Sequence, residues 1–207
     1  MGYIKQQIRL LVKESGDKKR ARAASEEWFN ESVKSRKDKD VQLTPRPFKP
    51  GKIYVFDYVH PKWEKELDWF DKKPVVLALN PINETTDCGI NLNLLPISFK
   101  ENLLDAFYHA YEGVIESTET GSNRNDAMKQ RPIMTLRYEH VKTYMEKFGF
   151  GFAVRAYKTN LKKNQTVVSY ESWPRIALCD FIKIHGSNVW AVRRLFAKYY
   201  VINKSKF

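Results

Sequence analysis

Three short stretches of the chain, residues 52–59, 74–80 and 89–95, are rich in β-branched and aromatic side chains and are separated by polar, turn-forming segments. This composition is typical of β-strands. In the third stretch apolar residues alternate with Asn, which is the pattern of a strand with one buried face. The sequence therefore predicts a small antiparallel sheet or barrel of about three to five strands.

Helical patterns follow these strands. Residues 99–111 place five large apolar side chains on one helical face, namely Phe99, Leu103, Leu104, Phe107 and Tyr111. Further helices are predicted over residues 136–148, ended by Gly149, over 172–182, with Pro174 in the first turn, and over 189–200. Residues 151–157 fit a helix or a short strand, and 167–170 fit a strand. Strands followed by helices predict an α+β fold.

The first 49 residues have a different character. Residues 3–12 show helical spacing, and residues 14–40 are mostly good helix formers that end in a charged, Pro-rich stretch near residue 50. The apolar stripe of this second helix is narrow and consists of Trp28, Phe29 and Val33. We therefore expect a basic helical arm and linker over residues 1–49, and an α+β core domain with a basic C-terminal helix over 50–207.

The net charge of +12 is concentrated at the two ends of the chain. Residues 1–50 hold 13 Lys and Arg against 7 Asp and Glu, and residues 181–207 hold 6 Lys and Arg with no acid. The middle of the chain is neutral. Basic ends of this kind indicate a polyanionic partner, most often nucleic acid, or acidic surfaces of neighbouring subunits. The charge pattern leaves both alternatives open.

Candidate contact residues lie in these basic ends. Cations expected to meet nucleic acid or a partner protein are Lys18, Lys19, Arg20, Arg22, Arg193, Arg194 and Lys198. Apolar side chains expected to dock in a groove of a partner are Trp28, Phe29 and Val33. This apolar stripe favours a protein partner slightly, because phosphate contact does not require it.

No convincing catalytic or metal-binding pattern is present. The four histidines are isolated in the sequence, and no Gly-rich phosphate loop or Cys/His pair can be found. Acidic residues gather at Glu64, Glu66, Asp68 and Asp71, but lysines alternate with them, as in a solvated loop between strands. We predict no catalytic residue, no metal and no cofactor.

The two cysteines, Cys88 and Cys179, are far apart and belong to no Cys/His cluster. We expect two reduced, partly buried thiols and synthesis in a reducing compartment. No apolar run approaches the roughly 20 residues that a membrane-spanning helix needs, so no membrane association is predicted.

Four segments together resemble a family of tailed-bacteriophage virion proteins. They are residues 50–58, 62–71, 73–77 and 89–96, followed by a helix at 103–111 and a Trp-led helix at 170–182. The most distinctive part is the Gly-Ile-Asn-Leu-Asn-Leu-Leu-Pro text of residues 89–96. The resemblance covers residues 50–200 and implies a structural protein of large contractile-tailed phages, in a family whose members are sometimes described as DNA-end protectors.

A shorter stretch is similar to MazF-like toxin barrels, which cleave RNA. The likeness rests on residues 50–57, 73–77 and 94–98. That family requires an arginine just before the proline-led strand, where this chain has Lys73, and a catalytic Thr or Ser after the third strand, where Ser98 is the nearest match. We take from this resemblance the shape, a small SH3-like barrel flanked by helices, and not the activity.

These observations predict a non-enzymatic structural component of a tailed-phage virion, in the tail, baseplate or neck. It would be made in the host cytoplasm and assembled into the virion. Its partners would be other virion proteins in a symmetric assembly, with the packaged DNA end as a further partner. The alternatives are a nucleic-acid-binding DNA-end protector and a MazF-like endoribonuclease.

Overall fold

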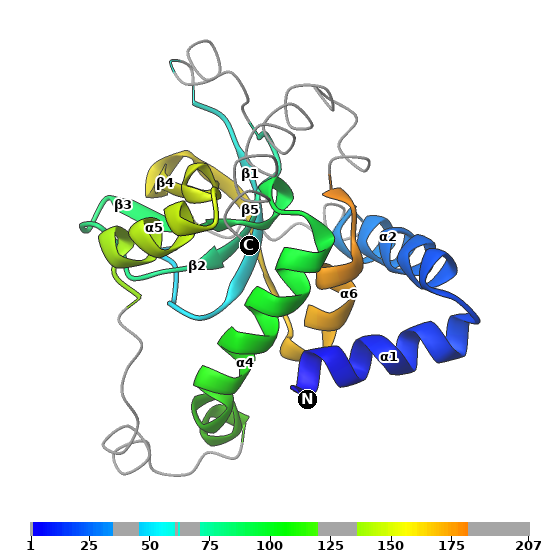
Figure 1. The fold of residues 1–207 in the computed structure, drawn as a ribbon. Coiled ribbons are helices and arrows are strands. Elements are labelled where there is room, and N and C mark those ends of the chain that lie inside the picture. The colour runs from blue at the N-terminus through cyan, green and yellow to red at the C-terminus, as the bar shows by residue number, and fades with distance from the viewer. Residues whose placement is uncertain (1, 35–45, 61, 63–70, 120–135, 182–207) are drawn as a thin grey trace.

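A computed structural model describes residues 2–34, 46–60, 62, 71–119 and 136–181 of the chain (Figure 1). The fold is α+β, as the sequence predicts. Its centre is a five-stranded antiparallel sheet with the strand order β4-β3-β2-β1-β5. The strands are β1 (Ile53–Tyr58), β2 (Val75–Ala78), β3 (Thr86–Asn91), β4 (Val154–Lys158) and β5 (Lys162–Val168). The sheet is open, with β4 and β5 as its two edges.

The three strands predicted first are confirmed as β1, β2 and β3, but the third ends earlier than expected. After Asn91 the chain turns into a 3-10 helix, η2 (Leu92–Leu94). The Asn91 side chain accepts a hydrogen bond from the Asn93 amide at 3.0 Å, which stabilises this turn and stops the strand. The alternation of apolar residues with Asn therefore does not continue as a strand to residue 95.

The second half of the chain supplies the two edge strands. Residues 151–157, predicted as a helix or a strand, contain both, because the 3-10 helix η4 (Gly151–Ala153) leads directly into β4. A second 3-10 turn, η5 (Thr159–Leu161), joins β4 to β5. Strand β5 pairs with β1, so the last strand returns to the first, and it begins five residues before the predicted stretch 167–170.

The α-helices in the described residues are α1 (Tyr3–Ser15), α2 (Lys18–Lys34), α4 (Ile97–Glu119), α5 (Tyr138–Lys147) and α6 (Trp173–Leu178). Helix α1 ends at Gly16, whose φ of 87° is readily adopted by glycine. Helix α6 was expected to continue to residue 182. It stops at Cys179, where the backbone becomes extended. The predicted C-terminal helix over 189–200 lies outside the described residues.

Each face of the sheet is buried in its own core. Ile53 and Val55 of β1 point toward the helices, and the residues between and after them, Tyr54 and Phe56, point to the opposite face. Phe48 covers this second face and stacks on Tyr54 with a centroid distance of 4.6 Å. The core therefore includes residues before position 50, where the sequence had placed a linker.

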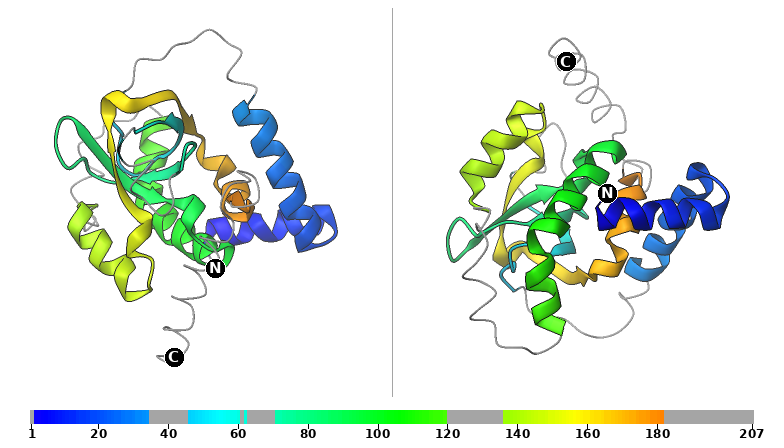
Figure 2. Two further views of the ribbon diagram at one scale, coloured as in Figure 1. Left: turned by 90° about the horizontal axis from the view of Figure 1, so that it is seen from above. Right: turned by 60° about the horizontal axis from the view of Figure 1, so that its bottom comes forward.

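Helices α1 and α2 pack against the rest of this chain. Their buried side chains Ile4, Ile8, Ala21 and Phe29 belong to the same core cluster as the sheet and helices α4 and α6. Figure 2 shows α1, α2, α4 and α6 grouped together beside the sheet. The helical part of the predicted arm is therefore docked on the core, whereas the charged segment 35–45 lies outside the described residues.

Both cysteines are free and completely buried, whereas the sequence predicts thiols that are only partly buried. Within the part of the chain that the structure describes, no helix has both the length and the apolar character needed to cross a membrane.

Candidate nucleic-acid interface

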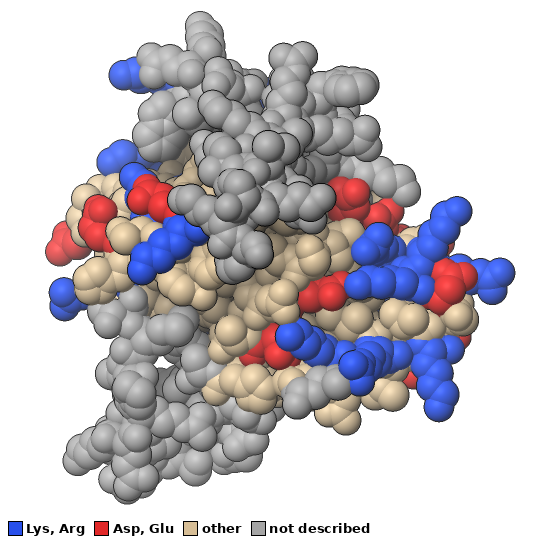
Figure 3. Space-filling view, viewed as in Figure 1, with Lys and Arg blue, Asp and Glu red and all other residues tan. Residues whose placement is uncertain are grey.

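A one-sided stripe of cations runs along α1. Lys5, Arg9 and Lys13 follow each other at intervals of four residues, so their Cα atoms are about 6 Å apart along the helix axis. Ile4 and Ile8 are buried on an adjacent side of the helix, whereas Lys5 is half-buried and Arg9 and Lys13 are exposed. Figure 3 shows Lys and Arg side chains gathered over α1 and α2 at the right of the view. We call Lys5, Arg9 and Lys13 the α1 stripe.

Contacts at the start of α1 hold this stripe in place. The carboxylate of Asp105, in α4, accepts a hydrogen bond from the backbone N–H of Lys5 at 3.3 Å. It thereby supplies the negative charge that the first turn of α1 lacks. Gly2 lies so close to Asp105 that a side chain there would clash with the carboxylate. Tyr3 stacks on Tyr108 of α4 with centroids 4.3 Å apart.

The cluster predicted from the sequence, Lys18, Lys19, Arg20 and Arg22, does not form a single surface. Residues in a helix are separated by about 100°, so Lys18 and Arg22 lie on one side of α2, whereas Arg20 points away from them. Lys18 pairs with Glu101 of α4 at 2.8 Å, and Arg20 makes an exposed pair with Asp17 at 3.5 Å. Arg22 is half-buried. Lys19 is exposed in the first turn of α2.

The apolar stripe of α2 is used within this chain. Phe29 is buried and packs edge-on against Phe181, with centroids 5.0 Å apart. Trp28 is half-buried, and the Arg175 guanidinium lies 5.9 Å from its ring centroid. The Phe29 ring is therefore covered by side chains of its own chain, and its predicted contact with a neighbouring subunit stays a prediction. Val33 lies in α2, but its side chain is outside the described residues, as are Arg193, Arg194 and Lys198.

Asp71, the one described member of the acidic cluster between β1 and β2, has a structural role. Its carboxylate accepts hydrogen bonds from the backbone N–H of Lys73 at 2.9 Å, from Asn91 at 3.2 Å and from Asn93 at 2.5 Å. Lys73 lies shortly before β2, Asn91 is the last residue of β3, and Asn93 lies in η2. Glu64, Glu66 and Asp68 lie outside the described residues. Among the described residues, His, Cys, Asp and Glu side chains form no group suited to a metal ion.

The toxin resemblance points to Lys73 and Ser98. The contacts of these two residues within the described part of the chain show no catalytic arrangement. The backbone of Lys73 belongs to the Asp71 network. Ser98 is exposed in the first turn of α4, where its carbonyl accepts a hydrogen bond from the Asn102 side chain at 3.1 Å.

Two buried lysines have functions that the sequence did not indicate. Lys162 pairs with Asp87 at 2.6 Å, and both side chains are almost completely shielded from solvent. Lys100 of α4 donates a hydrogen bond to the carbonyl of Cys179, at the end of α6, and lies 4.6 Å from the Phe181 ring centroid. Burial lowers the pKa of Lys100 to about 8, although Cys179, Asp180 and Glu26 oppose this shift. Both lysines connect elements of the core.

The candidate contact residues that the sequence analysis did not single out are Lys5, Arg9 and Lys13 of the α1 stripe. Their four-residue spacing was a usable signal, because it places them on one face of a helix whose adjacent face is apolar. The dense run of cations at positions 18–22 is more conspicuous in the sequence, but it says less about which cations share one face of a helix.

No family model matches the chain, and no solved structure matches it significantly.

Proposed function

We propose that this protein is a non-enzymatic structural component of a tailed-phage virion, in the tail, baseplate or neck, and that it contacts nucleic acid through the α1 stripe. The stripe carries the proposal because Arg9 and Lys13 are exposed, and Lys5 half-buried, on one side of a helix that is fixed to the core at its N-terminal end. Phosphate backbones are bound chiefly by such cations. The virion assignment rests on the resemblance, and other virion proteins in a symmetric assembly would be its partners.

The burial of Phe29 weakens the case for a protein partner relative to a nucleic-acid partner. The apolar stripe of α2 had favoured a groove on a neighbouring protein, and its central residue is now accounted for by Phe181 of the same chain. Among the described residues, the side chains of Lys5, Arg9 and Lys13 form no ion pair. Contact with nucleic acid, as a DNA-end protector would make, is therefore favoured over arms that bind only protein.

A finer description of the fold belongs to this proposal. Strands β1 to β4 are neighbours in chain order, and β5 returns to the free side of β1. The two edge strands are consecutive in the sequence and are joined by one 3-10 turn. Bringing these edges together would close a small barrel. We therefore regard the sheet as an opened SH3-like barrel that serves as a scaffold for the helices.

The proposal that the protein is not an enzyme is supported by how its polar groups are used. Asp71 accepts three hydrogen bonds from the surrounding fold, and Asp87 accepts bonds from Phe48, Thr159 and Lys162. A carboxylate with its lone pairs occupied in this way is poorly suited to act as a base or to bind a metal. Synthesis in the host cytoplasm followed by assembly into the virion is part of the same proposal.

The test is the salt dependence of DNA binding, measured by fluorescence anisotropy with a labelled duplex. If Lys5, Arg9, Lys13 and Lys19 each neutralise one phosphate, the affinity should fall roughly 150-fold between about 50 and 200 mM salt. Arg9→Glu should reduce the slope of log affinity against log salt by about 0.9 or more. Lys49→Glu makes the same change of charge at an exposed site away from α1, and is the matched control.

Binding that is equally weakened by Arg9→Glu and Lys49→Glu would mean that overall charge, and not the α1 stripe, attracts DNA. Binding that is insensitive to salt would reject the nucleic-acid contact itself. The virion assignment has its own test, which is detection of the protein in purified particles by mass spectrometry with copy counting.

A further inference from the structure

One side of helix α5 carries basic and aromatic side chains and no acid, whereas Lys142 lies with the two acids on the other side. Tyr144 and Phe148 are four residues apart, and Arg137, His140 and Lys147 lie within about 60° of Tyr144 around the helix axis. The two acids of the helix, Glu139 and Glu146, lie on the other side. Val141 and Met145 form the buried side. We call Arg137, His140, Tyr144, Lys147 and Phe148 the α5 face.

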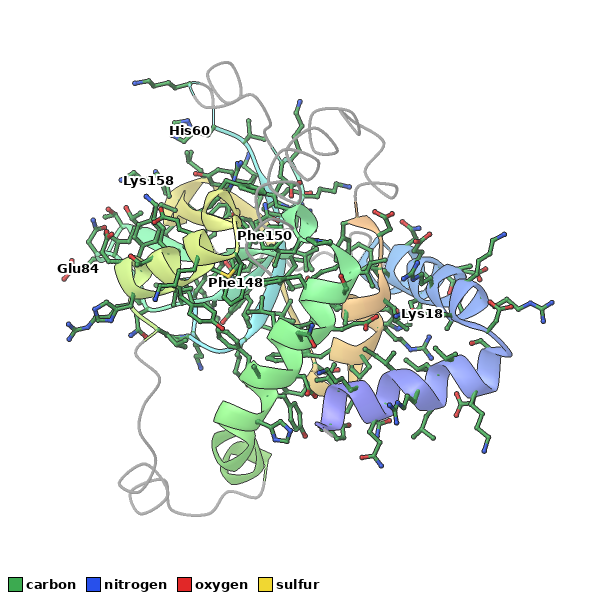
Figure 4. The ribbon with its side chains drawn as sticks, in the orientation of Figure 1. Lys18, His60, Glu84, Phe148, Phe150 and Lys158 are labelled. Carbon is green, nitrogen blue, oxygen red and sulfur yellow. The ribbon has the colours of Figure 1, made fainter. Side chains whose placement is uncertain are left out.

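The two rings of this face belong to a supported series of aromatic contacts. Tyr144 is 54% exposed and packs edge-on against Phe148, with centroids 5.0 Å apart. Phe148 contacts Phe99 of α4 at 5.7 Å, and Phe99 contacts Phe150 at 4.5 Å. Figure 4 shows Phe148 and Phe150 where the end of α5 meets α4. Tyr144 therefore presents an exposed ring on a support that is already packed.

The acids are kept away from these rings. The side chain of Glu146 lies over Gly151, where a side chain on residue 151 would overlap it. Glu139 is in the first turn of α5, where its charge favours the helix dipole. A polyanion approaching Tyr144 would therefore meet cations and aromatic rings on the same side of the helix.

We propose that the α5 face binds single-stranded nucleic acid, with an unpaired base stacked on Tyr144 beside Phe148. Arg137 and Lys147 would neutralise the adjacent phosphates. Exposed aromatic rings next to cations are the usual means of binding single strands without sequence preference. This inference rests on the proposed function, since both require nucleic acid, and it deepens that function by assigning unpaired bases to a second site.

The cations decide between nucleic acid and a protein partner. An apolar protein surface would match the rings but would leave Arg137 and Lys147 facing it without a counter-charge. A nucleic-acid strand offers a π-face and a phosphate within one nucleotide, so it satisfies both kinds of side chain. We therefore assign the face to a single strand.

The test compares binding of a labelled 12-nucleotide oligo(dT) with binding of a duplex at fixed salt. Tyr144→Ala should weaken oligo(dT) binding by roughly fivefold to a hundredfold, the range for loss of one stacked base. Duplex binding should change less than twofold. Tyr144→Phe keeps the ring and should bind oligo(dT) like the wild type. Because Tyr144 is exposed, these variants should remain folded, which circular dichroism will check.

An abasic oligonucleotide of the same length separates stacking from charge. The wild type should bind it about as weakly as Tyr144→Ala binds oligo(dT), and Tyr144→Ala should cause no further loss. Equal oligo(dT) affinity for the wild type and Tyr144→Ala overturns the inference and leaves the face available for a protein partner. In that case a normal effect of Arg9→Glu on duplex binding would show that the proposed function survives.

Discussion

The ring of Phe29 in α2 packs edge-on against the ring of Phe181, which follows α6, although 152 positions separate them in the sequence. Lys100 lies 4.6 Å from the same Phe181 ring. Helix α2 thus packs against Phe181, which is the last residue of the chain that the structure describes. The stability of the core should depend on this contact.

The first prediction is that Phe29→Ala destabilises the whole protein. Loss of a buried phenylalanine costs about 3 to 5 kcal/mol, because a cavity remains where the ring was. Urea unfolding followed by tryptophan fluorescence should show one transition at a lower midpoint. Glu27→Ala, at an exposed site of the same helix, should leave the midpoint almost unchanged. An unfolding curve for Phe29→Ala that matches the wild type would mean that α2 is not part of the core.

The second prediction concerns the ion pair of Asp87 and Lys162. Lys162→Met leaves Asp87 buried without its counter-charge and should lower the free energy of unfolding by about 3 to 5 kcal/mol. Asp87→Asn combined with Lys162→Met removes both charges and keeps an acceptor for the Phe48 N–H, which Asp87 binds at 2.9 Å. The double variant should therefore be more stable than Lys162→Met by itself.

A double-mutant cycle measured by urea unfolding will give the coupling energy of this pair, which is expected to be about 1 to 3 kcal/mol. Additive effects of the two substitutions would show that each side chain acts through its other contacts. For Lys162 these are the Arg46 carbonyl at 2.8 Å and the Phe48 ring at 3.9 Å.

The α+β class and the first three strands could be predicted because they depend on local composition. The end of β3 could not, because it depends on Asn91, which binds both the Asn93 amide and the distant carboxylate of Asp71. An alternating pattern of Leu and Asn fits a strand and a capped turn equally well. A tertiary contact decides between them.

The docking of the arm was missed for a similar reason. A narrow apolar stripe shows that a helix must pack on something, but not whether the partner lies in the same chain. The candidate interface was only partly predictable, because the density of cations at positions 18–22 does not indicate which of them share a face, whereas the four-residue spacing of Lys5, Arg9 and Lys13 does. Residues 193, 194 and 198 lie outside the described residues, so their predicted contacts stay predictions.

The third prediction is a pH dependence of stability that arises from Lys100. Burial lowers its pKa in the folded protein to about 8 from an ordinary value of 10.5. Between these values the unfolded chain holds a proton that the folded protein has released, so the free energy of unfolding rises with pH. From about pH 7.5 to 9.5 the contribution of Lys100 is on the order of 2 kcal/mol. Below about pH 8 Lys100 is protonated in the folded protein, so the free energy of unfolding is reduced by the full cost of the buried charge.

The measurement is the difference in unfolding free energy between the wild type and Lys100→Met at several pH values. The wild type should gain on the variant as the pH rises. Burial raises the pKa of Cys88 and Cys179 to about 12, which acts in the opposite direction, but both thiols are present in both proteins. Lys147→Met, which changes an exposed lysine, is the control. A difference that does not vary with pH would show that Lys100 titrates normally in the fold.

The last prediction separates a structural role of Asp71 from a catalytic one. Removing its carboxylate by Asp71→Ala leaves the side-chain amides of Asn91 and Asn93 without their shared acceptor, in a site where both residues are buried. The expected cost is about 2 to 4 kcal/mol of unfolding free energy, because buried donors lose their partner. Ser98→Ala, at an exposed position, should change stability by less than about 0.5 kcal/mol.

Neither change should affect nucleic-acid cleavage, since the wild type is expected to cleave neither RNA nor single- or double-stranded DNA with magnesium or manganese. Cleavage by the wild type that Asp71→Ala or Ser98→Ala abolishes, while the variant remains folded, would replace the structural assignment with a ribonuclease or nuclease.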